Sequence, residues 1–178
     1  MSSLKTTHRW AVAQQNPELE KELSAGLGIP GLVARIMVAH GIGSIKEGQL
    51  FLTPSLDRDW ADPLIIPGMS VVADRVERAI RNHEHIAVFG DFDVDGITST
   101  CLLTEALRTF GADVTPFIPR RFDEGYGLSR AALDRVNELA RPQLIVTVDN
   151  GIAAKEEVSY LESLGIDLVV TDHHEPSD

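Results

Sequence analysis

The sequence has 178 residues, of which 43% are hydrophobic and 24% are charged, a composition that argues against wholesale disorder. The formal net charge of −11 argues against a nucleic-acid clamp held by bulk positive charge. Two interpretations of the acids stay open, general solubility and clustering around divalent cations. Cys101 is the single cysteine, which excludes an internal disulfide and favours a reducing, cytoplasmic setting. The sequence shows no signal peptide and no stretch long enough for a membrane span, so no membrane partner is expected.

Residues 1–68 are predicted to form a small helical and irregular segment that precedes the main domain. Several prolines interrupt its short helical patterns. Apolar residues at helix spacing within 32–37 predict one modest amphipathic helix. The stretch 51–64 is expected to be irregular and to wrap a larger domain. Nothing in this segment indicates chemistry, so its expected role is structural.

Residues 69–178 are predicted to form the catalytic domain, because strand and helix patterns alternate regularly there. The strands are entirely apolar, as strands buried on both faces of a sheet are. Such a pattern predicts an α/β fold with a parallel, doubly wound sheet and flanking helices. Helices are expected over about 70–83, 98–110, 129–140 and 154–164, and strands over 86–89, 114–118, 144–148 and 168–170.

Acids and histidines follow three of these strands directly. The strand at 86–89 is followed by the segment GDFDVDG at 90–96, and the strand at 144–148 is followed by DNG at 149–151. The strand at 168–170 is followed, after one residue, by DHH at 172–174. Ligands gather outside the carboxyl ends of strands in an open parallel sheet. We therefore expect these groups to converge on one rim, although up to eighty residues of chain separate them.

The five carboxylates and two imidazoles at this rim would repel one another or be buried at a cost unless a cation neutralised them. Oxygen and imidazole ligands fit Mn²⁺ or Mg²⁺, whereas a structural zinc site would want thiolates. Two such ions, roughly 3.5–4 Å apart, can clamp a phosphodiester and activate a water.

Each motif has a simpler explanation when taken alone. The spacing of acids at 91–96 also opens a calcium-binding EF-hand loop, but the twelfth position is Leu102 rather than Glu, and a strand precedes the loop. The other two motifs could be an ordinary turn and a pair of surface histidines. On a continuing strand His173 and His174 would point opposite ways, so at most one is expected to be a direct ligand.

The segment 118–127 forms a fourth candidate, because it follows another predicted strand. Its two arginines and its tyrosine could hold a phosphate and stack a base. A surface turn with a helix cap fits its composition equally well.

The segments GDFDVDGITST, RFDEGYGLS, VTVDNGI and VTDHHEP resemble the DHH phosphoesterases and, within them, the RecJ single-strand-specific DNA exonucleases. The resemblance covers about residues 50–178. It implies a hydrolase dependent on Mn²⁺ or Mg²⁺ that removes nucleotides from the 5′ end of single-stranded DNA in recombination and repair. Single-stranded DNA would be its substrate, and repair or replication proteins would be its further partners.

The resemblance also implies roles for individual residues. Asp149 is expected to bridge two metal ions, and His174 to orient or polarise the scissile phosphate. Arg121 would hold a substrate phosphate and Tyr126 would contact a base. Whether Asp172 binds metal is left open. The implied metal ligands or their close neighbours are Asp91, Asp93, Asp95, Asp149 and His173.

The chain departs from the family pattern after the third motif. The resemblance implies a further aspartate downstream, then a second domain and nucleic-acid-binding domains. We therefore expect a fragment with reduced metal affinity and weak or absent exonuclease activity, and a two-metal site only in the complete protein. Two other functions stay open: a DHH hydrolase acting on oligoribonucleotides, cyclic dinucleotides or pyrophosphate, and a non-catalytic DHH-like binding module.

Overall fold

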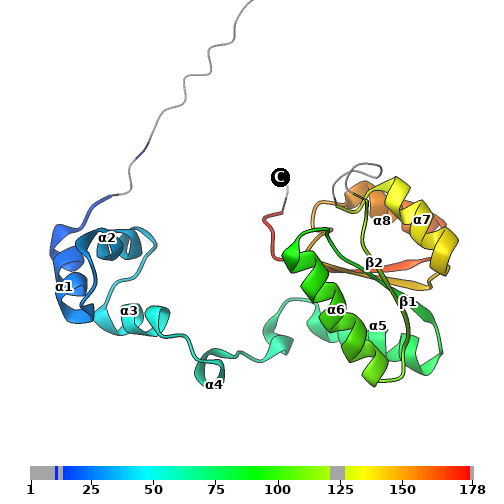
Figure 1. The fold of residues 1–178 in the computed structure, drawn as a ribbon, viewed down its shortest axis with the longest axis horizontal. Helices are drawn as coiled ribbons and strands as arrows, with labels where there is room; N and C mark the ends of the chain where they lie inside the picture. The colour runs from blue at the N-terminus through cyan, green and yellow to red at the C-terminus, as the bar shows by residue number, and fades with distance from the viewer. Residues whose placement is uncertain (1–10, 12–13, 121–126, 177–178) are drawn as a thin grey trace, which may run out of the picture. The chain divides into compact units, whose positions relative to one another are not determined.

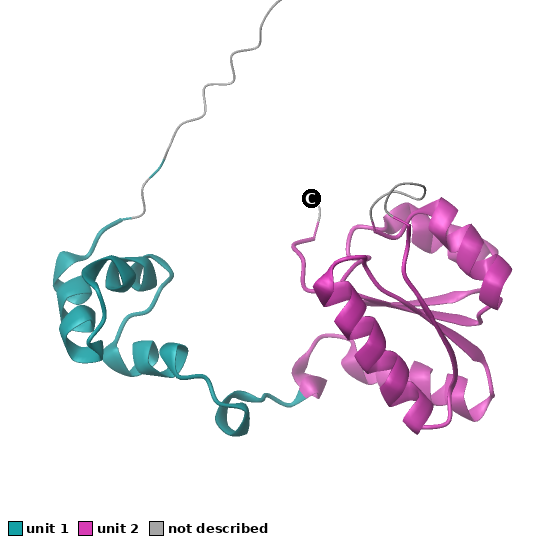
Figure 2. Ribbon diagram, in the orientation of Figure 1, with its two compact units in different colours: residues 1–62 teal, residues 63–178 magenta. Residues whose placement is uncertain are grey.

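The computed structural model describes residues 11, 14–120 and 127–176. The chain divides into two compact units, residues 1–62 and 63–178, which are coloured separately in Figure 2. The division predicted at residue 68 falls just before the first long helix of the second unit. That boundary stays a prediction.

The first unit is helical in its described part. Its core forms around three buried side chains, Leu23, Ala34 and Met37, and the amphipathic helix predicted within 32–37 is present. The stretch 51–64 was expected to be irregular but holds the end of one helix and two short helical turns. The helices are α1 (Pro17–Leu27), α2 (Gly31–Ala39), α3 (Ile45–Leu52) and α4 (Leu56–Asp59).

The second unit alternates helices and strands, as the sequence predicts. The largest difference from prediction is at α6, which begins at Val94 rather than Thr98, because the side chain of Asp93 caps the helix. The elements are η1 (Pro63–Ile65), α5 (Met69–Arg81), β1 (His85–Phe89), α6 (Val94–Thr109), β2 (Asp113–Phe117), α7 (Arg130–Ala140), β3 (Leu144–Val148), α8 (Lys155–Ser163) and β4 (Asp167–Thr171).

The four strands form one parallel sheet in the order β2-β1-β3-β4. Helices α5 and α6 cover one face and α7 and α8 cover the other (Figure 1). Each face therefore has its own apolar core, and the central strands β1 and β3 contribute to both. This arrangement confirms the predicted doubly wound α/β fold. In the described part of the chain, no helix is both long and apolar enough to cross a bilayer.

The strand order creates a switch point between β1 and β3. From β1 the chain passes through α6 to β2 on one side, whereas from β3 it passes through α8 to β4 on the other. The two connections leave over opposite faces, so a crevice opens at the carboxyl ends of β1 and β3. The acidic segments after both strands begin at this crevice.

Candidate metal centre

The loop after β1 places a buried carboxylate beside the start of α6. Asp91 is only 1% exposed; its Oδ1 accepts a hydrogen bond from the backbone of Phe92 at 2.7 Å, and its Oδ2 has no hydrogen-bond partner among the described residues. Asp93 accepts a hydrogen bond from the backbone of Gly96 at 2.9 Å and so begins the helix. A Cβ at Gly96 would lie 2.5 Å from the backbone N and C of Asp91. Only glycine lets the helix approach this loop so closely.

Asp149 follows β3 in the left-handed backbone region, with a φ of 62°. Its Oδ1 lies 2.9 Å from Nε2 of His173, and its Oδ2 is buried without a hydrogen-bond partner in the described part of the chain. Burial raises the pKa of the Asp149 carboxyl above its ordinary value, the hydrogen bond to His173 opposes that shift, and the negative charge of Asp93 adds to it. Asp93 therefore lies close enough to act on Asp149 electrostatically.

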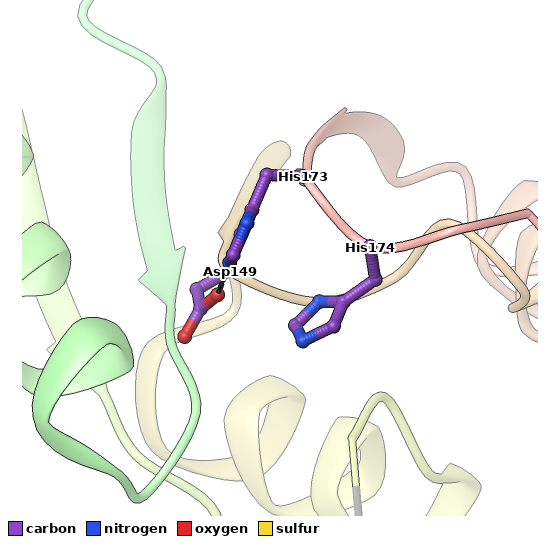
Figure 3. A group of neighbouring side chains, drawn as sticks. All are labelled: Asp149, His173 and His174. Atoms are coloured by element: carbon purple, nitrogen blue, oxygen red, sulfur yellow. Dashed lines mark hydrogen bonds and ion pairs between the residues drawn. The ribbon is translucent and has the colours of Figure 1, made fainter. Parts of the chain in front are cut away.

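His173 and His174 lie side by side next to Asp149 (Figure 3). Their ring centroids are 4.6 Å apart, and each of the three side chains offers a ligand atom within 4.8 Å of the other two. The expectation that the two histidines point opposite ways is wrong. Strand β4 ends at Thr171, so the alternation of side chains along a strand does not extend to them.

Asp172 is held by its neighbours rather than open to a ligand. Its side chain is 2% exposed and accepts hydrogen bonds from the backbone N–H groups of Ile152 and His174, at 3.0 and 3.1 Å. Nδ1 of His174 lies 2.7 Å from its Oδ1. Burial alone would raise the pKa of Asp172, but these hydrogen bonds outweigh it and lower the pKa. The same pair raises the pKa of His174.

Asn150 is a buried residue whose structural role the sequence did not indicate. Its Nδ2 donates to the carbonyl of Val148 at 3.1 Å and reaches the carbonyl of Phe89 at 3.5 Å. It therefore ties together the carboxyl ends of the two central strands, on either side of the crevice. From the sequence, the DNG segment indicates only a turn.

Two hollows flank Asp149. One, of about 490 Å³, lies between α6 and the ends of β3 and β4, and Asp95 and His173 line it. The other, of about 360 Å³, is lined by His174 and by small residues such as Gly151 and Ala153. Of the predicted ligands in the described chain, Asp149 and His173 belong to the compact group of three, whereas Asp91, Asp93 and Asp95 do not. Asp95 lines the first hollow together with Asp149 and His173. The predicted substrate residues Arg121 and Tyr126 lie outside the described residues.

Unpartnered buried carboxylate oxygens are unusual, because burial without a partner costs free energy. Asp91 and Asp149 each carry one, on opposite sides of the crevice, and two imidazoles stand beside Asp149. Carboxylate oxygen with imidazole nitrogen is a donor set that suits divalent cations such as Mn²⁺. The residues present therefore fit such an ion.

Fold and site together define an open parallel α/β domain whose strand ends gather carboxylates and imidazoles. Residues 85–178, more than half of the chain, match the family model described as the DHH family, N-terminal domain. The chain belongs to the DHH family.

Curated relatives extend the match over most of the chain. The chain is 40% identical over 168 residues to the single-stranded-DNA-specific exonuclease RecJ of Bacillus subtilis, covering 94% of this chain and 21% of that protein. It is 36% identical over 162 residues to RecJ of Escherichia coli, and this match covers 90% of this chain and 27% of that protein. The resemblance to RecJ inferred from the motifs is confirmed. The chain spans about a fifth to a quarter of the length of these relatives.

Solved structures show the same likeness. A crystal structure of exonuclease RecJ bound to manganese matches 62% of this chain and 28% of its own, with a TM-score of 0.58 and 40% identity. The structure of RecJ from Thermus thermophilus in complex with Mn²⁺ is 31% identical to this chain, with a TM-score of 0.60. The match covers 94% of this chain and 22% of that one.

Proposed function

We propose that this chain carries the metal-binding residues of a phosphodiester hydrolase that degrades single-stranded DNA from its 5′ end. Its curated relatives are named single-stranded-DNA-specific exonucleases, and related RecJ structures are described as bound to manganese or in complex with Mn²⁺ or Mg²⁺. In this proposal it acts in the cytoplasm, with repair or replication proteins as partners, and Mn²⁺ or Mg²⁺ as its cofactor.

The observation that carries the proposal is the state of Asp149. Its carboxylate is almost fully buried, one oxygen contacts an imidazole, and the other oxygen has no partner among the described residues. Asp93 lies near enough for its charge to raise the pKa of Asp149 further. A buried carboxylate that has an open oxygen and a second negative charge nearby favours a neighbouring cation.

The proposed roles follow from the positions of the side chains. Asp149 and His173 would hold the ion from one side of the crevice, and the carboxylates of Asp91, Asp93 and Asp95 would complete its surroundings from the other. A bound divalent ion would polarise the phosphodiester and make water a better nucleophile. His174, with a pKa raised by Asp172, would carry positive charge more readily and so hold or orient the scissile phosphate. Arg121 and Tyr126 keep their proposed contacts to substrate phosphate and base.

Calorimetric titration with Mn²⁺ tests the metal part of the proposal. We expect wild-type protein to bind the ion and Asp149→Asn and Asp93→Asn to weaken binding, by roughly 100-fold or more for Asp149, because loss of a direct ligand should exceed the 10–100-fold effect of an outer partner. Asp113→Asn is a matched control, since Asp113 also pairs with an imidazole, that of His85, but at the opposite end of the sheet. Equal affinity in all these proteins would refute the metal site.

The substrate part is tested separately with 5′-labelled single-stranded DNA, duplex DNA and dinucleotides, in the presence of Mn²⁺. A full-length version of the protein is used beside this chain, because this chain alone is expected to have weak or absent activity. Release of label from single-stranded DNA, lost in Asp149→Asn but kept in Asp113→Asn, is the expected result. Preference for dinucleotides would instead assign the site to the small-substrate DHH hydrolases. Mn²⁺ binding without hydrolysis of any of the three, even by the full-length version, would leave the binding-module function as the better description.

A further inference from the structure

Asp172 occupies the same kind of position as Asp149, directly after a strand and next to an imidazole, but its carboxylate is engaged differently. Asp149 keeps one oxygen that no described residue contacts by a hydrogen bond. In Asp172, Oδ2 accepts from the Ile152 backbone N–H at 3.0 Å, while Oδ1 accepts from the His174 N–H at 3.1 Å and contacts its Nδ1 at 2.7 Å. Its side chain is 2% exposed. Both oxygens of Asp172 are therefore already used within the protein.

The contact with Nδ1 fixes the state of the His174 ring. An ionised carboxylate can only accept hydrogen bonds, so Nδ1 must carry a proton whenever this contact exists. In the neutral ring the other nitrogen, Nε2, is then the one left with a lone pair. His173 is the reverse case, because its Nε2 contacts Oδ1 of Asp149 at 2.9 Å. While both carboxylates are ionised, the two adjacent neutral histidines therefore hold opposite tautomers.

The contact with Ile152 ties two loops together. Ile152 lies in the turn that follows Asp149, whereas Asp172 begins the segment after β4. A single buried carboxylate therefore joins the loop that carries Asp149 to the loop that carries both histidines. Without it, little else among the described hydrogen bonds would hold His174 within 4.8 Å of Asp149.

We propose that Asp172 is a positioning residue and not a metal ligand. It holds the neutral His174 ring in its Nδ1–H form and locks the loop after β3 to the loop after β4, so that Asp149, His173 and His174 stay together. The effect on metal affinity rests on the proposed function. The effect on the ring and the loops does not, because it belongs to the metal-free protein.

Nitrogen NMR of ¹⁵N-histidine-labelled protein tests the ring directly, without metal and at a pH where both imidazoles are neutral. The expected spectrum shows His174 as the Nδ1–H tautomer and His173 as the Nε2–H tautomer. Asp172→Ala should shift His174 toward the other form and leave the tautomer of His173 unchanged. The proposal would be overturned if His174 of the wild-type protein were in the Nε2–H form, or if the His174 tautomer were the same in Asp172→Ala as in the wild type.

Mn²⁺ titration of two variants separates positioning from direct ligation. Asp172→Ala should weaken binding roughly 10–100-fold, the usual effect of losing an outer partner of a ligand. Asp172→Asn keeps an oxygen that can accept from Nδ1–H, so it should recover part of that affinity and keep the His174 tautomer. A loss of affinity in Asp172→Ala with the His174 tautomer unchanged would refute positioning, because a direct ligand acts on the ion and not through the ring.

Two controls keep these outcomes distinct. Asp113→Asn alters another carboxylate–imidazole pair and should leave Mn²⁺ binding unchanged. Should Asp172→Ala fail to fold by circular dichroism, the tautomers of wild type and Asp172→Asn still decide the question. If wild-type protein does not bind Mn²⁺ at all, the proposed function fails. The positioning role is then still decided by the tautomers of His173 and His174, which are measured without metal.

Discussion

Replacing Gly96 with alanine sets two opposite effects against each other at the start of α6. Alanine is favoured over glycine within a helix by about 1 kcal/mol. The added Cβ, however, would lie 2.5 Å from the backbone N and C of Asp91, which cannot move aside as a flexible side chain could. Relieving such an overlap costs typically about 1–3 kcal/mol and occasionally more. The overlap outweighs the gain in propensity, and we expect Gly96→Ala to lower the free energy of unfolding by about 1–2 kcal/mol.

Urea unfolding followed by far-UV circular dichroism measures this loss, and Mn²⁺ titration measures its consequence for the site. The overlap should push the Asp91 loop away from α6, so metal affinity is expected to fall together with stability. Val94→Ala is the matched control, because Val94 is 73% exposed in the same helical turn and should change stability by no more than about 0.5 kcal/mol. A Gly96→Ala protein as stable as wild type, with unchanged Mn²⁺ affinity, would show that the loop and the helix are not closely apposed.

Three further predictions use other contacts of the second unit. Arg75 donates a hydrogen bond to Glu84 at 2.7 Å, and this contact lowers the pKa of Glu84 below its ordinary value of 4.5. The pair therefore stabilises the folded protein fully above pH 4.5, and this stabilisation is lost as the pH falls through the lowered pKa. Glu84→Gln should therefore cost about 1 kcal/mol at pH 7 and progressively less below pH 4.5, as measured by urea unfolding across that range. Asp149→Asn removes a buried charge that has an unpartnered oxygen, so in EDTA its thermal unfolding midpoint should rise even though metal binding is lost; a lower midpoint would contradict the cost assigned to that charge. Ser129→Ala removes the cap that accepts from the backbone of Ala132 at 3.2 Å and should cost about 1 kcal/mol of unfolding free energy, a loss that Ser129→Asp should largely avoid.

The sheet could be predicted from the sequence because strands that are buried on both faces are rich in apolar residues. Strands β1 and β3 are covered on both faces, so they consist mainly of apolar residues, with no regular alternation of polar and apolar positions. The start of α6 could not be predicted in the same way. Asp95 and Gly96 are poor helix formers, and their local preference favours a loop. The cap from Asp93 and the close approach to Asp91 decide the outcome, and both depend on the folded loop.

The meeting of the acids and histidines at one rim follows from topology, which the alternation of strands and helices already indicates. The separate roles of Asp149 and Asp172 do not, because both are acids placed directly after a strand. What distinguishes them is a backbone N–H donated by Ile152, twenty residues before Asp172 in the chain. That donor engages the Asp172 carboxylate, whereas one oxygen of Asp149 has no hydrogen-bond partner among residues 14–120 and 127–176. Motif spacing records which side chains reach the rim, whereas hydrogen bonds between the loops decide which of them remain able to bind an ion. A mutational test of these acids should therefore follow the histidine tautomers together with Mn²⁺ affinity, since an amide oxygen can still accept the hydrogen bond that a positioning carboxylate accepts.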